Sequence, residues 1–201
     1  TGGLTCGRKD PDHAIFPYYT DDKIHDAAAT TGPFSAMRVS RDGETLLWTP
    51  FSDRYAGLYD LQRRLLKSNY GEQVLFEEAN RSLGLTFRYR WQFSKNYGFL
   101  RLAELQNEGE GDVAVELLDG LRNLLPAGAD RRTQERASTL VDAYKYSELS
   151  PETGLALYSM SSIITDRAEP SEALEATTVW HAGLDGAAVL LSEEQVPAFL
   201  G

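Results

Sequence analysis

The strongest constraint on the fold is a stretch near the middle of the chain in which large apolar side chains occupy every second position. The apolar set is Leu83, Leu85, Phe87, Tyr89, Trp91 and Phe93, and the intervening set is Gly84, Thr86, Arg88, Arg90 and Gln92. A period of two places one set on each face of a β-strand. The stretch therefore predicts a strand with one buried aromatic face. We expect the arginines on the opposite face either to pair with acids such as Glu104 or Glu116 across strands or to face a neighbouring domain.

Two more apolar runs follow, at residues 97–105 and 113–117, separated by the turn-prone segments 94–96 and 107–111. Together these runs predict a three-stranded antiparallel meander. A single sheet cannot bury its own apolar face, so a second layer must cover it. The expected fold class is all-β, a two-layer antiparallel β-sandwich of supersandwich-like form with one or two short helices.

Upstream, Asp42-Gly43 lies between β-prone runs at 34–39 and 45–48 and predicts a hairpin, because both residues tolerate positive φ. Residues 53–70 are ambiguous, since Leu58, Leu61 and Leu65 have helical spacing. The same region could instead form strands at 65–68 and 73–79 that pair across Asn69-Tyr70-Gly71, and we favour strands.

Downstream, residues 131–140 are helix-compatible and are expected to give way to a strand near Val141. Further strands are expected at 155–164, 177–180 and 187–191. Ser192 and Gln195 have the spacing of a capping box, which indicates a helix start.

These elements suggest three regions. Residues 1–33 form a loop segment packed on the sandwich, residues 34–191 form the β-sandwich domain, and residues 192–201 begin a linker helix to a missing C-terminal domain. Thr1 is not an initiator methionine, so we expect a processed or excised chain. The expected last helix is stopped early by Gly201, so we also expect the polypeptide to continue.

Charge and composition exclude several classes of function. The 201-residue chain has a formal net charge of -10, and the part after Ser150 holds eight acids against one base, Arg167. Such a surface repels a phosphate backbone, so no nucleic-acid partner is expected. No apolar run approaches the roughly 20 residues that span a bilayer, so no membrane partner is expected. The single cysteine, Cys6, allows no internal disulfide.

Motifs that would identify a cofactor or a catalytic centre are absent from the sequence, so we predict no cofactor and assign no catalytic residue. His13 and His25, with Asp21, Asp22 or Asp26, could in principle hold a metal. Histidines beside acids in loops commonly bind nothing, and we predict no metal site.

The best candidates for substrate binding are Tyr18, Tyr19, Asp21 and Asp22. An aromatic ring stacks on the C–H groups of a sugar, and a carboxylate accepts hydrogen bonds from its hydroxyls. The alternative, which we favour, is that the tyrosines are packing residues of the fold and the aspartates are turn residues. Arg167 and Glu169 lie in a charge-dense segment and are interface candidates, either clamping an anionic group or holding two strands in register. Trp48, Trp91 and Trp180 are expected to be core or sheet-face residues.

Several segments together resemble a known family. They are Phe76-Glu77-Glu78-Ala79-Asn80, 85–91, Tyr97-Gly98-Phe99, 117–126, 141–145 and 166–173. The set resembles the N-terminal part of large bacterial proteins of the cellobiose-phosphorylase-like kind, over about residues 34–180. In those carbohydrate-active enzymes a β-supersandwich precedes an (α/α)6 barrel.

The resemblance implies that the catalytic acid and the phosphate site belong to a helical domain that this chain does not contain. The chain would then be the non-catalytic N-terminal domain of a glycoside phosphorylase or hydrolase. Its partners would be the C-terminal helical catalytic domain of the same polypeptide, an oligosaccharide and a possible second copy in a homodimer. The alternatives are a stand-alone carbohydrate-binding module, or a mutarotase-like sugar epimerase with a histidine and a carboxylate converging on a concave sheet face, for which His181 is the residue to test.

Overall fold

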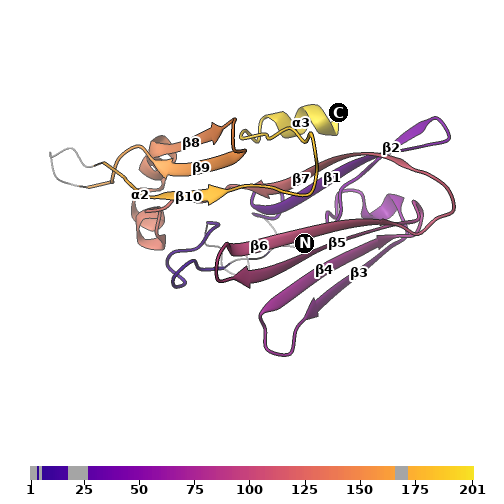
Figure 1. Ribbon diagram of the computed structural model, residues 1–201, viewed down its shortest axis with the longest axis horizontal. Coiled ribbons are helices and arrows are strands. Elements are labelled where there is room, and N and C mark those ends of the chain that lie inside the picture. Colours follow the sequence, from indigo (N-terminus) through magenta and orange to yellow (C-terminus); the bar gives the residue numbers. More distant parts are fainter. Residues whose placement is uncertain (1–3, 5, 18–26, 166–171) are drawn as a thin grey trace. The chain divides into compact units, whose positions relative to one another are not determined.

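The computed structural model describes residues 4, 6–17, 27–165 and 172–201, and its ordered elements are mostly antiparallel β-strands (Figure 1). The chain divides into two compact units. The first holds Phe34–Gly120, and the second holds Gly3–Pro33 together with Leu121–Gly201. The expected all-β fold class with a few short helices is confirmed.

Two sheets form the first unit. The four-stranded sheet has the order β3 (Leu61–Lys67), β4 (Gln73–Asn80), β5 (Leu85–Ser94) and β6 (Gly98–Asn107). The three-stranded sheet has the order β2 (Glu44–Trp48), β1 (Gly32–Arg41) and β7 (Ala114–Arg122). A short 3-10 helix, η2 (Ala56–Leu58), lies between β2 and β3.

The aromatic face of β5 supplies the core of this unit, as its alternation predicts. Phe87, Tyr89 and Trp91 are at most 4% exposed. The ring of Phe51 packs edge-on against Tyr89, with centroids 5.3 Å apart. Phe93, next to the end of the strand, was expected on the same buried face but is 66% exposed, and its ring packs edge-on against Phe99 with centroids 5.9 Å apart.

The two sheets are joined by contacts between their facing sides. The indole of Trp48 on β2 donates to the Glu78 carboxylate on β4, and the guanidinium of Arg101 on β6 bonds Asp119 on β7. Both contacts lie between layers, so the first unit is a two-layer sandwich whose interior includes charged groups.

The expected three-stranded meander is only partly right. β5 and β6 pair antiparallel through ten positions, from Leu85↔Asn107 to Ser94↔Gly98. β7, however, joins the other sheet, beside β1. An alternating pattern fixes which face of a strand is buried and leaves open which sheet the strand enters.

Both upstream hairpins form. Arg41 pairs with Glu44 across Asp42 and Gly43, which have φ of 52° and 83°. These positive values are those of a tight two-residue hairpin turn. β3 and β4 also pair antiparallel, so the strand interpretation of the ambiguous region is correct.

The second unit contains a three-stranded sheet in the order β10 (Ala176–Val179), β9 (Leu155–Met160) and β8 (Lys145–Ser150). The helix α2 (Arg131–Tyr144) supplies Val141 to a small apolar core with Leu125, Ala129 and Met160. The helix continues four residues past its expected end and is interrupted at Ala137, where φ is -144°.

Two expectations at the C-terminal end are wrong in detail. Residues 187–191 form no strand, although they are apolar. The last helix, α3, begins later than its capping-box signal, at Gln195–Leu200, and its N-cap is Glu194. The Ser192 hydroxyl accepts from the backbone N–H of Glu194 and stabilises the turn before the helix.

The described part of the N-terminal segment is ordered within the second unit. The backbone N–H of Leu125 donates to the Ile15 carbonyl at 2.9 Å, and that of Arg131 donates to the Asp12 carbonyl at 2.8 Å. Ala14, Ile15 and Phe16 are buried. Among the described residues, no helix has both the length and the apolar character needed to cross a membrane.

Candidate functional site

A buried carboxylate, Glu78, lies inside the sandwich unit and accepts three hydrogen bonds. It is fully buried. It accepts from Trp48 Nε1 at 2.8 Å, from the Phe51 backbone N–H at 2.8 Å and from Arg63 Nε at 2.5 Å. Because both oxygens have donors, this carboxylate is held in place and fastens β4 to β2, to the following loop and to β3.

A second, partly buried ion pair joins β6 to β7. The Arg101 guanidinium donates to both oxygens of Asp119, at 2.6 and 2.8 Å, and lies 4.4 Å from the centre of the Tyr89 ring. Ser35 on β1 also donates to Asp119. Burial raises the pKa of the Tyr89 phenol, so this ring stays neutral and packs against the guanidinium as a cation–π partner. Both clusters therefore hold the layers together.

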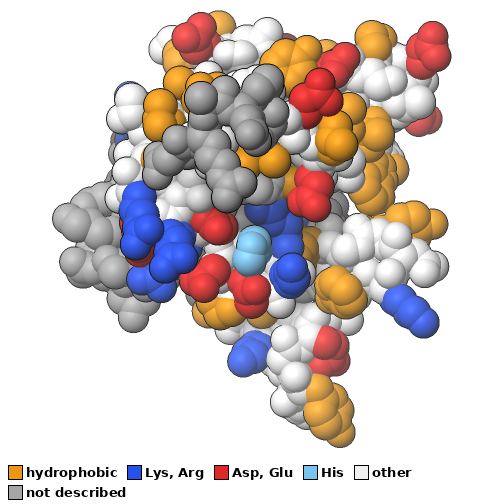
Figure 2. All heavy atoms as spheres, turned by 90° about the vertical axis from the view of Figure 1, so that its left-hand side faces the viewer, with side chains coloured by type: hydrophobic (Ala, Val, Ile, Leu, Met, Phe, Trp, Pro, Cys, Tyr) orange, Lys and Arg blue, Asp and Glu red, His pale blue; other side chains and the backbone are white. Residues whose placement is uncertain are grey.

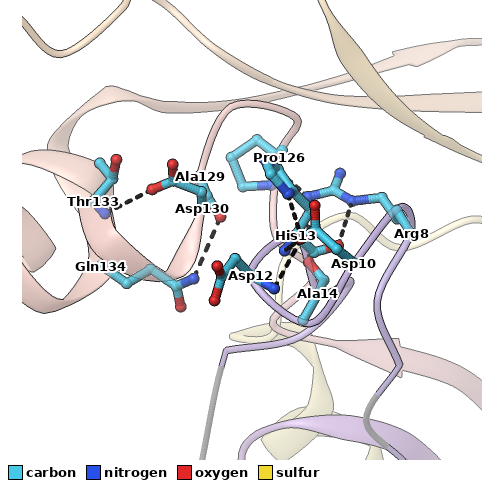
Figure 3. A network of polar contacts seen from close by, with 10 residues as sticks. All are labelled: Arg8, Asp10, Asp12, His13, Ala14, Pro126, Ala129, Asp130, Thr133 and Gln134. Atoms are coloured by element: carbon cyan, nitrogen blue, oxygen red, sulfur yellow. Dashed lines mark hydrogen bonds and ion pairs between the residues drawn. The ribbon is translucent and has the colours of Figure 1, made fainter.

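An exposed cluster of a different kind lies in the second unit, in the turn from Arg8 to Ala14 (Figure 3). The Asp10 carboxylate accepts from the backbone N–H groups of Asp12 at 3.0 Å and His13 at 3.1 Å. The same oxygen lies 2.6 Å from Nδ1 of the His13 ring. The side chains of His13 and Asp10 are 39% and 44% exposed. Hydrogen bonding from the His13 ring lowers the pKa of Asp10, so the carboxylate stays ionised at neutral pH.

Arg8 fixes this turn to the body of the unit. Its guanidinium donates to the carbonyls of Ala14 at 3.2 Å and Pro126 at 3.3 Å and to the hydroxyl of Thr177 on β10. That hydroxyl donates in turn to the Leu125 carbonyl at 2.9 Å. Burial lowers the pKa of Arg8, opposed by the charge of Glu175.

The start of α2 lies beside the same turn (Figure 3). Asp130 caps the helix by accepting from the Thr133 backbone N–H at 2.7 Å. Burial acts to raise the pKa of Asp130, but hydrogen bonds from Thr133, helped by His13, outweigh it and the net shift is downward. The His13 ring is thus near a second carboxylate. Figure 2 shows one face of the molecule, on which acidic and basic side chains surround a histidine.

The arrangement supports one kind of chemistry. When Asp10 holds the proton-bearing Nδ1, the other ring nitrogen, Nε2, is left to accept or donate a proton. No described residue bonds Nε2. A carboxylate behind an imidazole is the orientation used by general bases. Asp10 and His13 are three residues apart in one turn, so their contact also fits a purely structural role in stabilising that turn. The pair by itself therefore supplies a base and defines no reaction.

A nucleophile is not provided by the chain's cysteine. Burial raises the pKa of the Cys6 thiol to about 11, so the thiolate is scarce at neutral pH. Nor does any group of three or more His, Cys, Asp or Glu side chains among the described residues have the geometry to hold a metal ion.

The candidate residues from the sequence fall outside what the structure describes. These are Tyr18, Tyr19, Asp21 and Asp22 for sugar binding, Arg167 and Glu169 for an interface, and His25 and Asp26 for metal binding. His181 is exposed. Trp48 and Trp91 are buried, as expected, whereas Trp180 is 44% exposed. Arg88 pairs with Glu104 as expected, at 3.4 Å, whereas Glu116 pairs with Arg38.

Sequence reasoning missed Glu78. The signal was present, because Glu78 shares its face of β4 with the core residue Phe76, two positions away.

Comparison with known proteins adds no assignment: no family model matches the chain, and no curated protein matches it.

Proposed function

We propose that the chain is the non-catalytic N-terminal sandwich domain of a carbohydrate-processing enzyme, a glycoside phosphorylase or hydrolase. In this proposal it packs on an (α/α)6 catalytic barrel of the same polypeptide and lends loops to the substrate cleft. The sequence resemblance over residues 34–180 motivates the assignment, and the all-β fold class is the one that the resemblance requires.

The observation that carries the proposal is the use of charge inside the sandwich unit. Glu78 and Asp119 are held by two or more donors each, between sheets. A catalytic carboxylate must face a substrate and must change its protonation or bonding during the reaction. Carboxylates locked between layers serve as cross-links, which is the expected use of charge in a scaffold.

The first experiment is a turnover assay with the purified 201-residue chain. We expect no release of reducing sugar or sugar phosphate from cellobiose or another disaccharide, with either water or phosphate. Far-UV circular dichroism on the same sample confirms that the protein is folded. Turnover of a disaccharide by this chain would refute the proposal.

A second experiment separates a scaffold from a stand-alone binding module. An antibody raised against the chain should detect, in cells that make the protein, a polypeptide well above the 22.3 kDa of these residues. Isothermal titration of the chain with oligosaccharides should show no binding at millimolar concentration. A native polypeptide of about 22 kDa that binds an oligosaccharide would favour the carbohydrate-binding module instead.

A second candidate function is interconversion of sugar anomers through ring opening, as in a mutarotase-like epimerase, for which the Asp10–His13 pair would supply the base. His13 would act as the base, although it lies in a loop and not on a concave sheet face. Polarimetry of freshly dissolved glucose tests this candidate. A rate enhancement lost in His13→Ala and kept in His181→Ala would support it, and the absence of any enhancement by the unmodified protein would exclude it.

A further inference from the structure

The strand β3 is an open edge of the four-stranded sheet. It pairs with β4 on one side, and the sheet order of the described residues places no strand on the other. The backbone hydrogen bonds found outside the ladders, within the described part of the chain, include none from Leu61–Lys67. An edge strand presents a row of backbone donors and acceptors to any extended segment that can pair with it.

This edge carries apolar side chains on both faces of the sheet. Leu65, which pairs with Phe76 on the core side, is 65% exposed. Leu66, which pairs with Leu75 on the outer side, is 49% exposed. An added strand would cover both leucines, because neighbouring strands bring opposite side chains to within about 5 Å.

All the charged side chains of the edge strand are basic. β3 contains Arg63, Arg64 and Lys67 and no acidic residue. Arg63 is neutralised by Glu78 and Asp53. The side chain of Arg64 is 57% exposed, and its guanidinium lies 3.6 Å from the Glu77 carboxylate. Lys67 makes no ion pair with a described residue.

The same charges argue against a second copy of β3 as the partner, since antiparallel pairing of two such strands brings basic side chains together. Cationic side chains on an edge are a common device against self-association. An acidic strand meets no such penalty.

We propose that β3 is a docking edge for an extended acidic segment of another protein, which adds to the sheet as a fifth strand. Opposite Arg64, Leu65, Leu66 and Lys67, the complementary pattern is acid, apolar, apolar, acid. The pattern reads the same in both directions, so it fits parallel or antiparallel addition. Main-chain hydrogen bonds supply affinity in such strand addition, and side-chain complementarity supplies specificity.

An open hollow adjoins the start of the edge. It has a volume of about 440 Å³ and is lined by Tyr59, Asp60, Leu61 and Arg63.

The test uses a fluorescein-labelled peptide with the core Glu-Val-Val-Glu between Ser and Thr residues, titrated with the full 201-residue chain. Fluorescence anisotropy measures binding, and hydrogen exchange locates it. We expect saturable binding, protection of the β3 amides, and at least tenfold weaker binding of two control peptides. One control has Lys in place of Glu, and the other has N-methylated valines that cannot donate hydrogen bonds.

Matched protein variants separate a specific edge from general attraction between opposite charges. The double variant R64E/K67E should lose at least tenfold in affinity. The variant R41E/K95E makes the same change in net charge at the β1–β2 and β5–β6 turns and should bind as the unmodified protein does. Equal losses in both variants, protection elsewhere than β3, or no binding would each overturn the proposal. So would a dimer, seen by sedimentation, that R64E/K67E dissociates, because it would assign the edge to a second copy.

Discussion

The buried Glu78 carboxylate provides the sharpest test of how the sandwich is held together. The substitution Glu78→Gln keeps the size of the side chain and replaces one acceptor oxygen with an NH2 group. Trp48 Nε1 bonds one oxygen, and the Phe51 N–H and Arg63 Nε bond the other. In either orientation of the amide, at least one buried N–H group then faces another donor.

The expected loss follows from these contacts. A buried donor left without a partner costs about 1–3 kcal/mol. Breaking a buried ion pair costs about 3–5 kcal/mol, but Arg63 is 31% exposed and keeps Asp53, so only part of that cost applies. We expect Glu78→Gln to lower the free energy of unfolding by about 3 kcal/mol, a large share of the 5–15 kcal/mol typical of a domain.

Urea unfolding followed by tryptophan fluorescence measures this change. For a slope of about 2 kcal/mol per molar urea, the midpoint should fall by about 1.5 M. The matched control is Glu77→Gln, the same substitution one residue earlier on the opposite face of β4. Glu77 pairs with Arg64 and Arg88 at 3.6 and 3.4 Å, and we expect a loss under about 1 kcal/mol. Similar shifts for the two variants, or a shift of Glu78→Gln below 0.5 M (about 1 kcal/mol on the same slope), would show that the buried carboxylate does not join the sheets.

Two further predictions concern the second unit. Asp130→Ala removes the N-cap of α2 and should destabilise the protein by about 1 kcal/mol at pH 6. The pKa of Asp130 is lowered on folding. The stabilisation by its carboxylate is therefore complete above the unfolded-state pKa of about 3.9 and is lost as the pH falls through the folded-state pKa. The stability difference between Asp130→Ala and the unmodified protein, measured by urea unfolding at pH 6 and pH 3, should therefore shrink at pH 3, and a larger difference at pH 3 would contradict the assignment. Cys6, with a pKa of about 11, should react with a disulfide reagent at pH 8 far more slowly than free cysteine, since roughly one thiol in a thousand is ionised at that pH. The protein unfolded in urea should react fast. Equally fast reaction of the folded protein would show that burial does not protect the thiol.

Local pattern predicted those parts of the fold that depend on neighbours in sequence. The alternation of β5 identified Phe87, Tyr89 and Trp91 as core, and Asp42-Gly43 identified the first hairpin. Both signals are complete within one strand or one turn, so they survive whatever packs around them.

The wrong predictions concern features that depend on contacts with distant parts of the chain. The pattern of β7 could not show that it pairs with β1, because sheet membership depends on residues far away in sequence. Phe93 has the parity of the core but is exposed next to the end of β5, and a period of two does not show where along a strand the burial stops. The Asp10–His13 pair was within reach of local reasoning, since an aspartate before proline favours a turn and the histidine follows three residues later.

The departure of β7 from the meander also bears on how the polypeptide acquires its structure. Strands β3 to β6 follow one another and need only short loop closures, whereas the Ser35–Asp119 bond joins residues separated by 84 positions. Loop closure over such a separation is slow compared with hairpin formation. A nascent chain that has emerged from the ribosome as far as Gly111 can assemble the four-stranded sheet while its aromatic side still lacks β7, so part of that apolar face is uncovered during this interval.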